Sequence, residues 1–134
     1  MSAVTTHNAE SPGPFLTQAV LAPPGSTLYV SGQCAVDPKT GKCVEGTVAD
    51  RTTQVLKNLA EVLKAGGMDL GDVVMVNVYL TNHAEDMEPM NEAYMRAFEG
   101  FSSPMPARTC VGVSHLPLDT DVEISCVAVK RPAA

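Results

Sequence analysis

An arginine lies in the middle of a short segment that otherwise has the composition of a β-strand. Residues 105–113 alternate small and β-branched side chains, and Pro104 precedes them. Because side chains alternate across a strand, Arg108, Cys110 and Gly112 share one face. A guanidinium with only Cys and Gly beside it is either an exposed charge or an anchor for an anion. Its planar fork matches a carboxylate, so an anionic ligand is the chemistry to test.

Glu123 lies in a second predicted strand, over residues 122–130, fifteen positions after Arg108. We expect the two residues on neighbouring strands, where the cation binds a small carboxylate and Glu123 holds a water against it. A carboxylate in that position can accept a proton from the water and return one to a leaving nitrogen. The alternative is structural: Arg108 is a solvated charge on an edge strand, or the two side chains form a salt bridge.

The other reactive side chains support simpler roles. Cys110 fits a small apolar filler beside Arg108 better than a nucleophile, because most buried thiols are inert. None of the four cysteines belongs to a Cys-x-x-Cys pair, so no metal or other cofactor is predicted. Cys34 and Cys43 flank a turn and are expected to be reduced thiols. The three histidines are far apart in tail or loop contexts, and no motif supports a Ser-His-Asp triad.

Length and composition restrict the class of protein. The 134 residues predict one domain, 1–134, with a polar tail over 1–14. The net charge of −6 argues against a nucleic-acid partner, which needs a clustered positive surface. No apolar run is long enough to predict a membrane span. The first ten residues have neither an apolar core nor an arginine, so we expect a cytoplasmic protein.

Local signals predict strands and helices in a mixed order. Thr47 and Asp50 form a capping-box start for a helix that Gly66 and Gly67 end, and a second helix is expected to begin at an Asp86 cap with Pro89 in its first turn. Gly32 marks a bulge or a point of close backbone approach. The predicted elements are strands over 15–21 and Thr27–Gln33, a turn over 37–41, a helix over Val48–Ala65, a strand over 72–80, a helix over 87–99, a strand near 105–113, a loop over 115–119 and a strand over 122–130. This order predicts an α+β fold with a single sheet and two helices on one face.

The strand over 72–80 is apolar on both faces. One side carries Val74, Val76, Val78 and Leu80, and the other carries Val73, Met75 and Tyr79. Two helices on one face leave the second apolar face without a cover from this chain. We therefore predict an obligate oligomer, with Arg108 and Glu123 near a subunit interface.

Five short segments, in this order, resemble the RidA/YjgF family of enamine/imine deaminases. The resemblance runs from Gly13 to about Lys130, and its most specific parts are Ser31-Gly32-Gln33, Asp37-Pro38-Lys39-Thr40-Gly41, Asn91 with Tyr94, Pro106-Ala107-Arg108-x-Cys110 and Val122-Glu123-Ile124. It implies a chorismate-mutase-like fold that assembles as a homotrimer around a barrel-like core. Three clefts would then lie between subunits, in agreement with the uncovered apolar face.

The resemblance also implies an activity and a set of site residues. Family members with the arginine hydrolyse 2-aminoacrylate and related 2-imino acids to 2-keto acids and ammonia, without a cofactor. By resemblance, Arg108 binds the substrate carboxylate with help from the Cys110 backbone N–H, and Glu123 orients or activates the water. The residues expected to line the cleft are Ser31, Gly32 and Asn91.

One position departs from the family pattern. Where the family usually has a tyrosine whose hydroxyl helps to hold the water, this chain has Phe15. This leaves two alternatives beside the general deaminase: a lapsed or diverged trimer that binds small carboxylates, and an imine hydrolase of a dedicated biosynthetic pathway. A nuclease ranks below these, because the acidic net charge opposes RNA binding.

Overall fold

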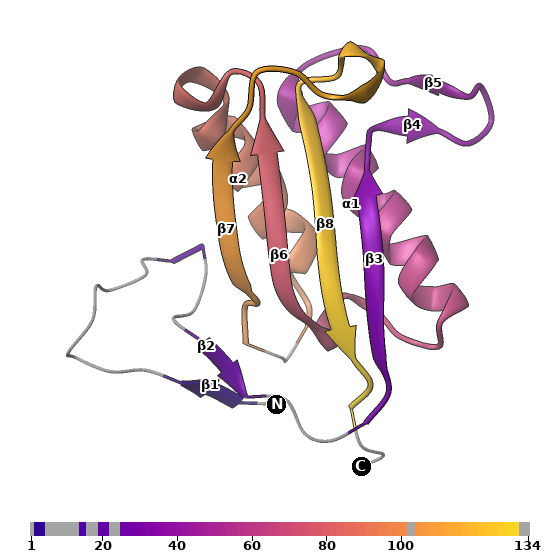
Figure 1. The fold of residues 1–134 in the computed structure, drawn as a ribbon, viewed down its shortest axis with the longest axis vertical. Helices are drawn as coiled ribbons and strands as arrows, with labels where there is room; N and C mark the ends of the chain where they lie inside the picture. The colour runs from indigo at the N-terminus through magenta and orange to yellow at the C-terminus, as the bar shows by residue number, and fades with distance from the viewer. Residues whose placement is uncertain (1, 5–13, 16–18, 22–24, 102–103, 132–134) are drawn as a thin grey trace.

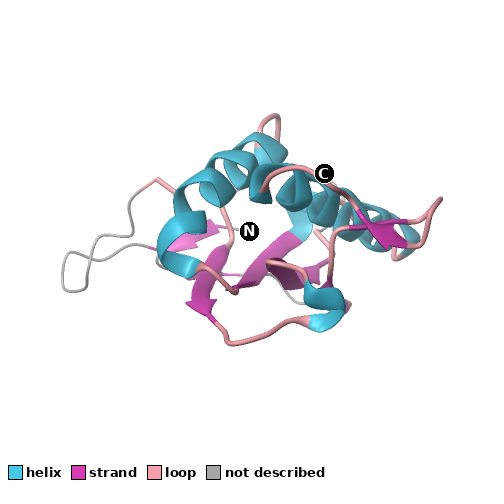
Figure 2. Ribbon diagram, turned by 90° about the horizontal axis from the view of Figure 1, so that it is seen from above, coloured by secondary structure: helices cyan, strands magenta, loops and turns pink. Residues whose placement is uncertain are grey.

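The main body of the protein is a four-stranded sheet with two helices on one face (Figure 1). The structure is a computed structural model, and it describes residues 2–4, 14–15, 19–21, 25–101 and 104–131. Seen from above in Figure 2, the helices form one layer and the sheet the other. The predicted α+β class, with one sheet and both helices on the same side, is confirmed.

The sheet has the strand order β3-β8-β6-β7. Its strands are β3 (Thr27–Gln33), β6 (Val73–Leu80), β7 (Ala107–Gly112) and β8 (Val122–Val129), and two small separate sheets pair β1 (Ser2–Val4) with β2 (Ala19–Leu21) and β4 (Val36–Asp37) with β5 (Lys42–Cys43). Strand β1 lies within the segment that the sequence analysis treated as a tail. Strand β8 is antiparallel to β3 and β6, whereas β6 and β7 are parallel. The expectation that the strands of Arg108 and Glu123 are neighbours is therefore wrong, because β6 separates β7 from β8.

Helix α1 (Val48–Ala65) has the predicted bounds. The Asp50 N–H donates to Thr47 Oγ1 at 3.2 Å, and the Thr47 N–H donates back to the Asp50 carboxylate at 2.9 Å. This capping box satisfies two N–H groups that the first turn leaves free. The helix ends at Gly66, and Gly67 has φ +76°, a conformation that glycine adopts at low cost.

Helix α2 (His83–Phe98) begins four residues before its predicted start. Its N-cap is Asn82, whose side chain makes no capping bond, so the expected Asp86 cap is wrong. The chain turns into the helix directly after β6, and Pro89 consequently lies in the second turn. Proline has no backbone N–H, so one helical hydrogen bond is absent at this turn, and the packing of the helix offsets the lost stability.

The two faces of the sheet differ in burial. The core on the helix side includes Val76, Val78, Leu80, Val122, Ile124, Cys126 and Ala128. A register shift between Val73 and Met75 turns Val73 into this core, which corrects its predicted face. On the other face Met75 and Tyr79 are only half-buried, and Tyr29 is 77% exposed.

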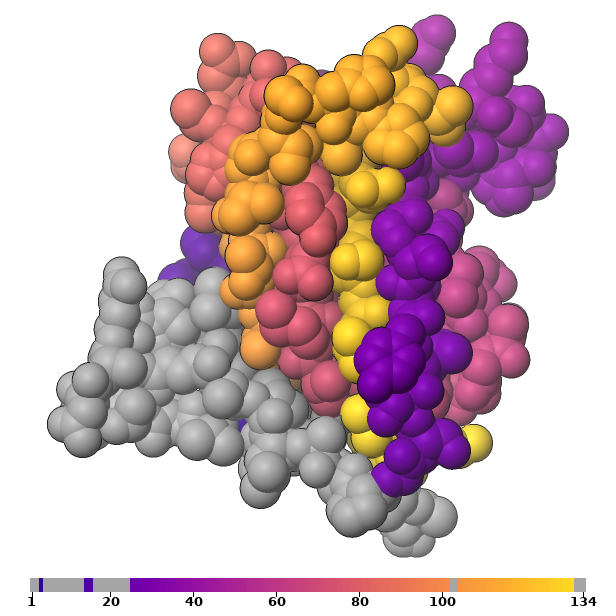
Figure 3. Space-filling view, viewed as in Figure 1, coloured from indigo at the N-terminus to yellow at the C-terminus, as the bar shows by residue number. Residues whose placement is uncertain are grey.

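The exposed face has no cover among the residues that the structure describes. Figure 3 shows strands β3, β8, β6 and β7 bare on the side away from the helices. The prediction that β6 is buried on both faces is thus not met within one chain. Cover by a second subunit stays a prediction. Across the described ranges, no helix is long and apolar enough to cross a membrane.

Candidate functional site

Arg108 lies on an outer strand, β7, and points toward the helices. It pairs in register with the buried Val76, and its guanidinium carbon is 4.8 Å from the centre of the Tyr94 ring. A cation over an aromatic face is attracted by the ring quadrupole. Its Nε and Nη1 atoms are buried, and among the described residues neither has a hydrogen-bond partner. Buried guanidinium N–H groups without an acceptor are costly, so this arrangement favours an anionic ligand.

Helix α2 carries two further buried polar side chains, one of which is the Tyr94 that Arg108 contacts. Asn91 and Tyr94 are one turn apart, and both are buried, at 4% and 0% exposure. The Oδ1 atom of Asn91 and the hydroxyl of Tyr94 also lack a hydrogen-bond partner in the described part of the chain. Burial raises the pKa of the Tyr94 hydroxyl, although the charge of Arg108 opposes this, so the phenol stays neutral and able to donate.

The contact of Arg108 with Tyr94 was missed from the sequence. Tyr94, which the sequence brought forward only as part of the family resemblance, is fully buried. The spacing of Asn91 and Tyr94 at i and i+3 was the available signal, because such residues share a helix face. Cys110 is half-buried on the same face of β7 as Arg108 and packs against the core. Burial raises the pKa of its thiol, which agrees with a filler more than with a nucleophile.

Glu123 lies on the opposite face of the sheet, on β8, and reaches over β3. A Cβ added at Gly32 would come within 2.8 Å of the Glu123 carboxyl carbon. Only glycine leaves this space open, so Gly32 is the predicted point of close approach, and the register of β3 shifts beside it. The Cys34 thiol lies 3.7 Å from Glu123 Oε1. Ser31, next to Gly32, is exposed.

The predicted site residues form two separate groups within one chain. Arg108 and Cys110 lie on the edge strand β7 and face the helices, whereas Glu123 lies on β8 and meets Gly32 of β3 on the open face. Strands β7 and β8 are two strand spacings apart, roughly 10 Å. A salt bridge between Arg108 and Glu123 in the same chain is therefore excluded. Phe15 lies in a turn and is half-buried, next to residues 16–18, which are outside the described ranges.

The cysteines and histidines give no metal site where the structure describes them. Cys34, Cys43, Cys110 and Cys126 are all free thiols. In the described ranges, no group of three or more His, Cys, Asp or Glu side chains could hold a metal ion. His7 lies outside these ranges. His115 Nε2 contacts the exposed Asp119 at 2.7 Å.

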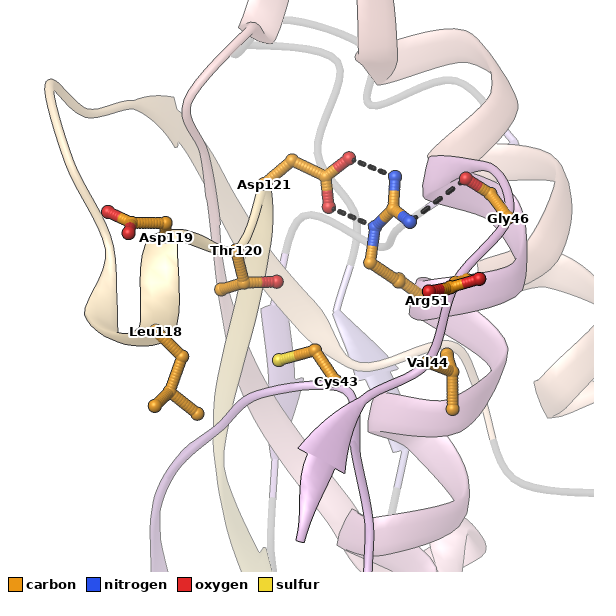
Figure 4. A pocket seen from close by; sticks show the side chains of 9 residues that line it. Cys43, Val44, Gly46, Arg51, Leu118, Asp119, Thr120 and Asp121 are labelled. Atoms are coloured by element: carbon orange, nitrogen blue, oxygen red, sulfur yellow. Dashed lines mark hydrogen bonds and ion pairs between the residues drawn. The ribbon is translucent and has the colours of Figure 1, made fainter. Parts of the chain in front are cut away.

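A cavity of about 330 Å³ opens near the start of α1 and the loop before β8 (Figure 4). Arg51 binds both carboxylate oxygens of Asp121 at 2.7 Å, and its Nη1 donates to the Gly46 carbonyl at 2.9 Å. These bonds connect the first turn of α1 to the start of β8. This pair was not predictable from the sequence, because its partners are 70 positions apart.

We predict that Arg51→Ala lowers the free energy of unfolding by about 1–3 kcal/mol, since it removes charge-assisted bonds to a largely buried carboxylate. The Arg51 and Asp121 side chains are only 20% and 18% exposed, so solvent screens the pair weakly. Urea denaturation at fixed protein concentration measures the loss. Lys57→Ala, at an exposed position of α1, is the control and should change stability little. Equal stabilities for the two variants would contradict the prediction.

The chain is similar to known proteins over nearly its whole length. The family model described as endoribonuclease L-PSP matches residues 6–130. A RutC family protein of Pyrococcus horikoshii is 44% identical over 96% of this chain and 97% of its own length. The human 2-iminobutanoate/2-iminopropanoate deaminase is 41% identical over 90% of this chain and 82% of its own. A crystal structure of the Rid family protein YyfB from Yersinia pestis has a TM-score of 0.85 at 30% identity, covering 96% of this chain and 98% of that one.

Proposed function

Because this chain belongs to the RidA/YjgF family, we propose that it hydrolyses 2-imino acids, including 2-aminoacrylate through its imine form, to 2-keto acids and ammonia. Relatives at about 40% identity named as 2-iminobutanoate/2-iminopropanoate deaminases support an imine deaminase. The observation that carries the proposal is Arg108, whose buried Nε and Nη1 have no partner in the described chain. A planar carboxylate is the ligand that such a fork accepts with two parallel bonds.

The chemistry of the reaction requires little beyond positioning and one proton carrier. Water adds to the carbon of the C=N bond while its proton passes to the Glu123 carboxylate. With the imine nitrogen protonated, this addition gives a neutral carbinolamine, and Glu123 then returns its proton to the amino nitrogen. As the C–N bond breaks and the C=O bond forms, the hydroxyl proton passes to the Glu123 carboxylate and is then taken up by the departing ammonia as ammonium. A carboxylate in this role contributes roughly 10²–10⁴ in rate. Arg108 contributes by holding the adjacent carboxylate, so that the imine carbon stays in place beside the water.

We propose that the site is completed between subunits of a homotrimer. Arg108 lies on the edge strand β7, and Glu123 lies on β8 with its carboxylate over the opposite edge strand, β3. A head-to-tail contact between copies would place the β7 edge of one copy beside the β3 edge of the next. Repeated contacts of this kind close into a ring. The bare face of the sheet, with the 77% exposed Tyr29, would then face the other copies.

The direct test is turnover by the purified protein. A source of 2-aminoacrylate, such as a pyridoxal-phosphate lyase acting on an amino acid, is coupled to detection of the 2-keto acid and of free 2-aminoacrylate trapped by a thiol. We expect faster keto-acid release and less trapped intermediate with the wild-type protein than with buffer. A normally folded protein that matches buffer in both measurements contradicts the proposal.

A second candidate is a lapsed or diverged trimer that binds small carboxylates, and Phe15 is the residue that favours it. We expect Phe15→Tyr to raise kcat by only about two- to tenfold, the effect of one added hydrogen bond to the water, above a wild-type rate that already exceeds buffer. Steady-state kinetics of the two proteins measures this. An inactive wild-type protein with a strongly active Phe15→Tyr variant would support the second candidate instead.

The description of the family model as an endoribonuclease does not lead us to propose RNA cleavage. The chain has 15 acidic and 9 basic residues. Binding of RNA phosphates depends on clustered positive charge, and a net charge of −6 opposes it.

A further inference from the structure

The residue just after β3 contacts the carboxylate that we propose as the proton carrier. Cys34 lies outside the segments that carry the family resemblance, and its role is not implied by them. Its Sγ atom is 3.7 Å from Glu123 Oε1, within the range for a hydrogen bond to sulfur, and the residues are 89 positions apart. The thiol is therefore in place to donate its proton to one oxygen of the carboxylate.

The Glu123 side chain occupies the space that a side chain at Gly32 would need. Gly32 lies so close that an added Cβ would be 2.9 Å from Oε1 and 3.1 Å from Cγ. Within the described part of the chain, the Cys34 thiol donates a hydrogen bond to Oε1 of this carboxylate. The missing side chain of Gly32 therefore leaves room for the carboxylate, and the Cys34 thiol holds its Oε1 atom.

The position of Cys34 is itself held from helix α1. Asn58 Nδ2 donates to the carbonyl oxygens of Cys34 and Val36 at 3.1 and 2.9 Å. The Asn58 Oδ1 atom accepts from Gln54 Nε2 at 2.9 Å, which fixes the amide orientation. These hydrogen bonds from the half-buried Asn58 side chain restrain the backbone that carries the thiol, so that Cys34 is a rigid support for Glu123.

The thiol keeps its proton at neutral pH. Burial raises the pKa of Cys34 to about 11, and the negative charge of Glu123 adds to this effect. A protonated thiol is a donor, whereas a thiolate would repel the carboxylate.

We propose that Cys34 is a positioning residue for Glu123, whose S–H group holds Oε1 and directs Oε2 toward the water that attacks the imine. This inference rests on the proposed function. It adds a residue that acts on the reaction through the carboxylate without touching the substrate.

Kinetics of three proteins tests the role. Cys34→Ala removes the donor, and one such bond corresponds to a loss of about two- to tenfold in kcat. KM should change little, because the substrate carboxylate is bound by Arg108. Cys34→Ser retains a donor of similar size and should keep at least about half of the wild-type kcat. A Cys34→Ala protein with wild-type kcat, or a serine variant as slow as the alanine variant, would overturn the proposal.

A measurement that needs no turnover separates this inference from the proposed function. If the Cys34 thiol faces the Glu123 charge, Glu123→Gln should raise the rate of Cys34 alkylation by iodoacetamide at pH 9 by about two- to tenfold, since loss of the charge favours the thiolate. Peptide mass spectrometry reports each thiol, and Cys110, on β7, serves as the internal control. An unchanged rate at Cys34 overturns the contact and with it the positioning role. A raised rate in a protein that fails to turn over imines supports the contact and places the failure in the proposed function.

Discussion

A mixture of two inactive variants, Arg108→Gln and Glu123→Gln, is expected to regain about one quarter of the wild-type activity when they assemble together. In a head-to-tail ring, each site takes Arg108 from one copy and Glu123 from the next. A junction is intact only where a Glu123→Gln copy supplies the arginine and an Arg108→Gln copy supplies the carboxylate. Random assembly at equal amounts makes this arrangement at about one junction in four, whatever the size of the ring.

The measurement is kcat per protomer after co-expression of the two variants at equal amounts and purification through one affinity tag that both variants carry, so that all assemblies are retained. The same variants mixed after separate assembly are the control and should stay inactive until subunits exchange. Wild-type protein assembled at equal amounts with the double variant should also retain about one quarter of the activity, whereas a site within one chain would retain about half. Failure of the mixed variants to recover any activity, in a normal oligomer, would contradict the shared site.

Arg108→Gln alone is expected to lower kcat/KM by about 10²–10⁴-fold, because two charge-assisted bonds to the substrate carboxylate contribute roughly 1.5–3 kcal/mol each. The kcat/KM of Arg108→Lys should lie between those of Arg108→Gln and the wild type, because lysine keeps the positive charge but lacks the planar fork of the guanidinium. In the described chain, the buried Nε and Nη1 of Arg108 make no hydrogen bond, so that the substitution removes only the contact of the guanidinium with the Tyr94 ring. We therefore expect the activity to fall while the free energy of unfolding changes little.

The matched control is Arg96→Gln, which removes an exposed arginine of helix α2 with the same change in net charge. Its kcat/KM should equal that of the wild type, apart from a small salt-dependent effect. Thermal unfolding of both variants shows whether either change acts through the fold. An Arg108→Gln protein with full activity, or one that loses activity only because it unfolds, would remove Arg108 from the site.

Features that depend on neighbouring positions were predictable from the sequence. The bounds of helix α1 agree with its capping box at Thr47 and its glycine stop, and the alternation in β7 correctly placed Arg108 and Cys110 on one face. The start of α2 was not predictable in the same way. Its N-cap makes no side-chain bond, and Pro89, which usually marks a first turn, lies in the second.

The separation of the two proposed catalytic residues required the strand order. Consecutive strands are usually neighbours, so β7 and β8 were expected side by side. Instead, α2 carries the chain across so that β7 lies parallel to β6, and β8 enters on the other side of β6. Arg108 and Glu123 consequently lie on strands separated by β6 and on different faces of the sheet.

The amino-acid sequence by itself determined which residues carry charge, which face of its own element each one shares, and where α1 begins and ends, because backbone geometry relates positions a few residues apart. Tertiary structure alone decided that Arg108 stacks on Tyr94, that the Cys34 thiol meets Glu123, and that the two halves of the site lie apart in one chain. These contacts join segments as much as 89 positions apart, and their register is set by packing of the whole sheet against the helices, which no local pattern records.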